Sequence, residues 1–117
     1  MQPVVTNTFK LGQYSLEDIL ADVACSFSVT AEYISSKHRK QDKVFMRKVF
    51  CWVVKELTAK RYSLLDIAYA IGYSNHTTVI HQLVDVKDFF LCRDSQWLEY
   101  WEHFTEHSRI WKEFKSK

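Results

Sequence analysis

The chain has 117 residues, a net charge of +2, and only 2 glycines and 1 proline. A phosphate-binding loop or a dinucleotide fingerprint needs several closely spaced glycines, so this chain cannot form a nucleotide site of either kind. An all-β sandwich needs frequent turn residues, whereas 47% hydrophobic residues in long stretches without breakers favour one helical domain.

The first part of the chain predicts an arm and two helices. Residues 1–14 show no hydrophobic period and are expected to form the arm. Ser15-Leu16-Glu17-Asp18 has the spacing of a capping box and predicts a helix over about 16–27. Its apolar residues recur at helical spacing: Leu16, Ile19, Leu20, Val23, Ala24 and Phe27. Thr30 is expected to cap a short second helix over about 31–36.

The positive charge of the chain is concentrated in residues 37–61. This stretch holds nine Lys or Arg residues against two acidic ones, net +7, while the other parts of the chain are net negative. Such a stretch is typical of a polyanion-binding protein, although a solvated helical face is the simpler alternative. A longer helix is predicted within it, from Asp42 to about Ala59. Its apolar positions include Val44, Phe45, Val49, Val53 and Leu57.

The segment from Ser63 to Leu83 predicts a helix-turn-helix. A second capping box opens a short helix at Ser63, and Gly72 lies where a helix end needs a left-handed residue. Ser74 or Asn75 can cap the next helix. The first turn of that helix presents short polar side chains, which suit base edges in a major groove: Asn75, His76, Thr77 and Thr78.

The C-terminal part predicts one aromatic-rich helix, capped by Ser95 after a break near residues 92–94. Its stripe steps by three and four residues: Trp97, Trp101, Phe104, Ser108 and Trp111. We expect the stripe to pack on the body, with a homodimer through this helix as the alternative. The prediction is an all-α chain of about six helices, with an arm (1–14), a helix-turn-helix domain (15–90) and a C-terminal amphipathic helix (91–117).

Other chemistry is not expected. Three cysteines that are far apart, no signal peptide and no run near 18 apolar residues predict a cytosolic chain with reduced thiols and no membrane contact. His76 and His81 are five residues apart and lie on different helix faces, so they do not have the spacing of a metal-binding pair. The cysteines do not have zinc-ligand spacing either. We find no catalytic motif and predict no enzyme activity, no cofactor and no nucleotide partner.

The sequence Asn75-His76-Thr77-Thr78-Val79-Ile80-His81 resembles the signature of the C-terminal DNA-binding domain of the bacterial replication initiator DnaA. That family typically reads Gly-Gly-Arg-Asp-His-Thr-Thr-Val-Ile-His there. Further matches follow in the same order over about residues 16–88: Leu16-Glu17-Asp18-Ile19, Ser36-Lys37-His38-Arg39-Lys40, Arg47, Lys55-Glu56-Leu57-Thr58 and Ser63-Leu64 with Ile67. The resemblance implies an all-α, Trp-repressor-like fold. We expect a stand-alone DnaA-like protein of a bacterium or phage, without the ATPase domain.

The resemblance also implies how the chain binds its expected partner, double-stranded DNA. Base contacts in the major groove are expected from Asn75, His76, Thr77 and Thr78, and in the minor groove from Arg39. Matching positions imply phosphate contacts by Arg47, Lys55, Ser63 and Leu64. Charge alone adds Lys37, Lys40, Lys43 and Lys48. We therefore predict a nucleoid-associated protein of replication control or transcriptional regulation. The alternative is a protein-interaction module that uses the aromatic helix.

Three residues depart from the family pattern just before the recognition helix. Tyr73 stands at the family's second glycine, Ser74 at its arginine and Asn75 at its aspartate, and two extra residues lie within 59–62. An aspartate accepts a hydrogen bond from cytosine, whereas an asparagine can bind adenine with two hydrogen bonds. The target site is therefore expected to differ from the usual box of the initiator.

Overall fold

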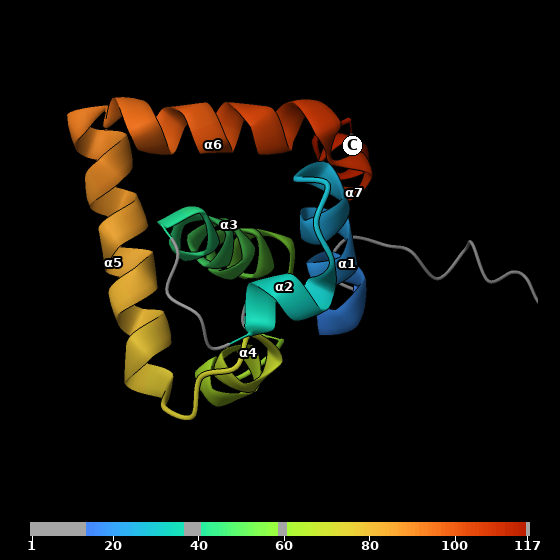
Figure 1. Ribbon diagram of the computed structural model, residues 1–117, viewed down its shortest axis with the longest axis vertical. Helices are drawn as coiled ribbons and strands as arrows, with labels where there is room; N and C mark the ends of the chain where they lie inside the picture. The colour runs from blue at the N-terminus through green and yellow to red at the C-terminus, as the bar shows by residue number, and fades with distance from the viewer. Residues whose placement is uncertain (1–13, 37–40, 59–60, 117) are drawn as a thin grey trace, which may run out of the picture.

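The computed structural model describes residues 14–36, 41–58 and 61–116, which form seven helices and, within these ranges, no strand. The helices are α1 (Leu16–Ser26), α2 (Ala31–Ser35), α3 (Gln41–Thr58), α4 (Leu64–Ala70), α5 (His76–Cys92), α6 (Ser95–His107) and α7 (Arg109–Lys115). Figure 1 shows α3 at the centre, with α5, α6, α1 and α4 arranged as a frame around it. The all-α prediction is confirmed.

The central helix α3 is buried around most of its circumference. Five residues between 49 and 54 are at most 1% exposed: Val49, Phe50, Cys51, Val53 and Val54. A helix with apolar residues on nearly every side has to lie inside the protein, because a single stripe covers only one face. Burial also raises the pKa of the Cys51 thiol to about 12.

Local capping chemistry fixes most of the helix starts. The side chains of Ser15, Thr30 and Ser63 accept hydrogen bonds from the backbone amides three residues later. Each bond satisfies an amide that the helix itself leaves without a partner. Of the two caps considered for α5, the structure selects Asn75. The predicted helices in the first 92 residues therefore lie within a residue or two of their expected bounds.

The C-terminal part differs from the prediction because it contains two helices, not one. Arg93 adopts a left-handed φ of 56° and ends α5, and Asp94 instead of Ser95 caps α6. Ser108 then starts α7 by accepting a hydrogen bond from the Trp111 amide at 2.9 Å. The aromatic side chains of Trp97, Phe104 and Trp111 are buried against the rest of the chain.

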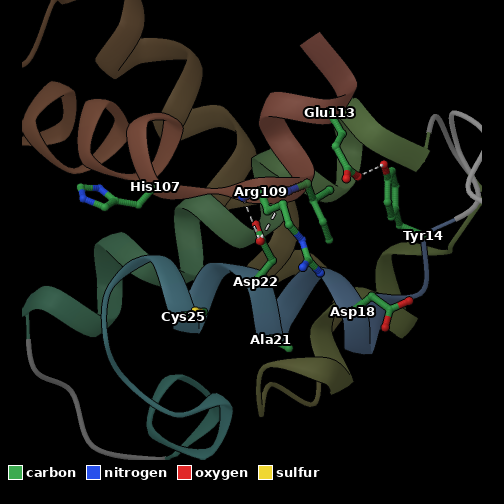
Figure 2. Close-up of a pocket in the computed structure, with 9 residues that line it drawn as sticks. Tyr14, Asp18, Ala21, Asp22, Cys25, His107, Arg109 and Glu113 are labelled. Atoms are coloured by element: carbon green, nitrogen blue, oxygen red, sulfur yellow. Dashed lines mark hydrogen bonds between the residues drawn. The ribbon is translucent and has the colours of Figure 1, made fainter. Parts of the chain in front are cut away.

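A carboxylate on α1 holds the start of α7. The Asp22 side chain accepts hydrogen bonds from the Ser108 hydroxyl and from the Arg109 and Ile110 amides, the latter two at 3.2 and 3.5 Å. Figure 2 shows Asp22 pointing toward Arg109, in a hollow across which Tyr14 reaches Glu113. The aromatic helices therefore pack within the chain, whereas a homodimer stays a prediction.

Candidate nucleic-acid interface

The turn between α4 and α5 has the geometry of a tight helix C-terminus. Gly72 takes a left-handed φ of +85°, and the amide of Tyr73 donates to the carbonyl of Ala68 at 2.9 Å. This pattern is the Schellman motif, in which glycine avoids the penalty that a Cβ would add. A Cβ on Gly72 would lie 2.3 Å from the carbonyl oxygen of Ser35, so the turn also contacts the end of α2.

The first turn of α5 carries the predicted base-reading side chains. The side-chain oxygen of Asn75 accepts the Thr77 amide at 2.8 Å, which caps the helix. Asn75, His76 and Thr77 are exposed, while Thr78 is half-buried. His81 is exposed as well. The structure thus brings the four polar residues together at an accessible helix N-terminus.

The residues predicted for the basic loop, Lys37, Arg39 and Lys40, lie outside the described part of the chain. The residues that flank the loop are described. On its N-terminal side the chain ends α2 and reaches Ser36, and on its C-terminal side α3 begins at residue 41.

Two cations of the expected phosphate-contacting set point into the protein. Lys43 is 2% exposed: its ammonium donates to the Ser36 hydroxyl and lies 4.4 Å from the centre of the Tyr33 ring. Arg47 is 5% exposed, and its Nε donates to the Ile34 carbonyl at 2.8 Å while Nη2 donates to the Ser36 carbonyl. Both side chains hold the end of α2 instead of lying on the surface.

Tyr33 completes this buried cluster from the side of α2. Its hydroxyl donates to Asp42 at 2.8 Å, and this hydrogen bond raises the pKa of Tyr33 above the usual value of a phenol. Asp42 also accepts the Lys43 amide at 2.8 Å at the start of α3. The two helices that flank the basic loop are therefore tied to each other by side chains on both sides of it.

The other expected phosphate contacts differ in accessibility. Lys48 is buried, and its ammonium reaches Gln82 at 2.7 Å and Asp85 at 3.0 Å on α5. Lys55 is exposed, lies 3.6 Å from Glu56 and covers the Trp52 ring. Ser63 is exposed, and its amide donates to Asp66 at 3.3 Å. Leu64 is half-buried at the first position of α4.

Sequence reasoning missed the partners of these buried cations. One of these partners is Tyr73, whose ring lies 5.2 Å from the Arg47 guanidinium and whose hydroxyl lies 3.4 Å from Nη1. One signal was available: Lys43 and Arg47 share a helix face with Phe50 and Val54, at spacings of four, three and four. That face is the buried one.

Comparison with known proteins identifies this arrangement. The family of bacterial dnaA protein helix-turn-helix domains matches residues 16–86, which include α4 and the first part of α5. The chain belongs to this family. The matched DnaA region is a DNA-binding domain. The first turn of α5 is the N-terminus of the second helix of its helix-turn-helix motif.

Individual relatives agree. The chain is similar to the chromosomal replication initiator protein DnaA of Bordetella pertussis, with 34% identity over 66% of this chain and 16% of the relative. The DnaA of Lacticaseibacillus casei is 36% identical over 60% of this chain and 15% of the relative. This DnaA-like chain therefore spans about 16% of the length of such relatives. No solved structure gave a significant match. Among the described residues, no helix combines the length and apolar character needed to cross a membrane.

Proposed function

We propose that this DnaA-family domain binds double-stranded DNA at specific sequences, with the first turn of α5 in the major groove. The observation that carries the proposal is the exposed set of polar side chains at the capped start of α5. Short side chains with donors and acceptors at this place in a helix-turn-helix match what base edges require.

We propose different parts for these residues. His76 and Thr77 are exposed and can approach base edges directly, and Thr78 adds its hydroxyl from a half-buried position. The amide oxygen of Asn75 caps the helix, which leaves its amino group as the part that donates to a base. Arg39 is proposed, on the family pattern, as the side chain that enters the neighbouring minor groove.

The phosphate contacts are proposed to come from fewer cations than charge counting suggests. Lys37, Lys40 and Lys55 remain in this role, together with the chain at Ser63 and Leu64. The cations that point inward are proposed to position the DNA-reading elements instead, because their charged groups already bind protein atoms: Lys43, Arg47 and Lys48. Phosphate contacts then set affinity and orientation, while the α5 residues set specificity.

The proposal is tested by selecting binding sites from a random duplex library with the full chain. Thr77→Ala should then weaken binding to the selected site by about 1–3 kcal/mol and leave binding to random duplex nearly unchanged. Thr105→Ala serves as the matched control, because this threonine lies on α6 and its hydroxyl donates to the Glu102 carbonyl of the same helix. Equal loss on selected and random duplex with Thr77→Ala would contradict the base-reading role, and selection of no site would contradict the function.

The biological role follows from which sites are occupied. We propose replication control or transcriptional regulation through occupancy of such sites. Crosslinking of the bound protein to the genome distinguishes the two roles, since sites at an origin favour the first and sites at promoters the second. A protein-interaction role through the aromatic stripe has less support, because Trp97, Phe104 and Trp111 are buried within the chain.

A further inference from the structure

The outward face of α5, which lies at the edge of the helical frame in Figure 1, carries exposed apolar side chains. Ile80, Val84 and Leu91 are 39%, 50% and 83% exposed. The inward face of the same helix already supplies core contacts through Val79 and Val86, which are both 0% exposed. A single exposed apolar residue needs no explanation, but Ile80 and Val84 continue the surface that begins at the first turn of α5.

The geometry of the helix places Ile80 between two of the exposed first-turn residues. At 3.6 residues per turn, Ile80 lies about 40° from His76 and about 60° from Thr77 around the helix axis. It is about 4.5 Å further along the axis than Thr77. Successive base pairs are about 3.4 Å apart, so a helix that places Thr77 on one base brings Ile80 within about two base steps of it.

The major groove offers an isoleucine side chain few favourable partners. Every base pair presents hydrogen-bonding groups there, and the 5-methyl group of thymine is the apolar group that side chains can contact. Isoleucine has no donor or acceptor, so against any other base edge it would displace water from polar groups without replacing their hydrogen bonds. An isoleucine at this position therefore favours thymine.

We propose that Ile80 is a specificity-determining residue that contacts the 5-methyl group of a thymine in the major groove. The inference rests on the proposed base reading by the first turn of α5, and it adds an apolar contact to the hydrogen bonds proposed there. DNA is the occupant of this face because the face is continuous with the first turn of α5 in a DNA-binding domain. Val84 extends the same apolar strip one turn further.

Deoxyuridine tests the proposal, because it differs from thymidine only by the absent 5-methyl group. Each thymine of the duplex selected by the full chain is replaced in turn. One replacement, within about two base steps of the position that Thr77→Ala relaxes, should weaken wild-type binding about fourfold, the value of one buried methyl group. For Ile80→Ala the same replacement should change the affinity by less than about 1.5-fold, because the side chain that contacts the methyl group is gone.

The ratio of the two affinities separates this role from a structural one. If Ile80→Ala lowers the fraction of folded protein, binding to the thymine and uracil duplexes falls equally and the ratio stays at about fourfold. Leu91→Ala is the matched control, because Leu91 is an exposed apolar residue of the same helix but lies about 16 Å beyond Ile80 along the axis. This variant should keep the full effect of the uracil replacement. Thr77→Ala should keep it as well, although threonine also carries a methyl group that can contact thymine.

An unchanged uracil effect in Ile80→Ala would overturn the inference, as would a selected site at which no thymine methyl group contributes to binding. Loss of the effect in Thr77→Ala alone would assign the methyl contact to Thr77 and overturn it too. If this face instead pairs with a second copy of the chain, Ile80→Ala and Leu91→Ala would both lower the sedimentation coefficient of the free protein and leave the uracil effect unchanged, which overturns the inference. All these results leave the proposed function intact, whereas a wild-type chain that selects no duplex would contradict that function itself.

Discussion

Replacing Lys48 by methionine distinguishes a phosphate-binding lysine from one that holds the recognition helix. The Lys48 side chain is 8% exposed, and its ammonium lies 2.7 Å from Gln82 and 3.0 Å from Asp85. Methionine keeps most of the volume and removes the charge. If Lys48 contacts a phosphate, the slope of log K against log salt should fall in magnitude by about 0.9. The structure predicts no change of slope.

The expected effect on stability is small. Lys48→Met loses a charge-assisted contact, but the Asp85 side chain is 49% exposed and water can replace the ammonium there. Hydrogen bonds to charged groups contribute about 1.5–3 kcal/mol. Because Asp85 is solvated, we expect a smaller loss of about 1 kcal/mol. Urea unfolding followed by circular dichroism measures this loss.

Fluorescence anisotropy with the selected duplex, recorded between about 50 and 200 mM salt, measures the slope. Lys40→Met is the comparison variant, for which the slope should fall by about 0.9 on every duplex. A fall of the same size with Lys48→Met would refute the inward assignment of this lysine. An unchanged slope with Lys40→Met would contradict the proposed phosphate contact of the loop.

Three further predictions concern the recognition helix, the C-terminal helices and the cysteines. Asn75→Asp should keep the cap of α5, because aspartate accepts the Thr77 amide equally well, and should shift the selected base toward cytosine in a repeated selection. Asp22→Ala should lower the free energy of unfolding by about 1–3 kcal/mol in urea titrations, because the start of α7 loses its acceptor, while DNA affinity stays within about twofold. At pH 8 an alkylating reagent should modify the exposed Cys25 and Cys92, whereas Cys51, with a pKa of about 12, should react only on unfolding.

The helix starts and the turn could be predicted because local chemistry decides them. Ser15 and Ser63 each cap a helix through a bond to an amide three residues away. Gly72 takes the left-handed conformation at the end of α4, for which glycine has no steric penalty. These interactions join residues that are close in the sequence, so the pattern of residue types is enough to find them.

The break between α6 and α7 could not be predicted in this way. Ser108 lies on the aromatic stripe at the spacing of one continuous helix. Ser108 caps α7 through the nearby Trp111 amide, but it is also held by Asp22, which is 86 residues earlier and accepts the Ser108 hydroxyl and the following amides. A carboxylate at a helix N-terminus is favourable, but nothing near Ser108 in the sequence indicates that one will be there.

The buried cations show why counting charges overestimates the number of lysines and arginines that lie on the surface. Charge counting treats every lysine and arginine as a surface group, but the helical period places Lys43 and Arg47 on the buried face of α3. The partners of Arg47 are backbone carbonyls and Tyr73, which is 26 residues away. The sequence therefore indicates that these side chains point inward, but it does not identify their partners.

Because three of the cations point inward, DNA binding by this domain should depend less on phosphate contacts and more on base contacts. If all nine cations of residues 37–61 contacted phosphates, the salt slope would be about −8, whereas three inward cations limit it to about −5. A smaller phosphate term leaves a larger share of specific affinity to the proposed base contacts of α5 and Arg39. Base contacts depend on position far more than screened charges do, since a hydrogen bond weakens steeply with distance and angle. Lys43, Arg47 and Lys48 lie inside the protein and contact α2, the turn and α5. These contacts would keep the proposed base contacts of α5 in place.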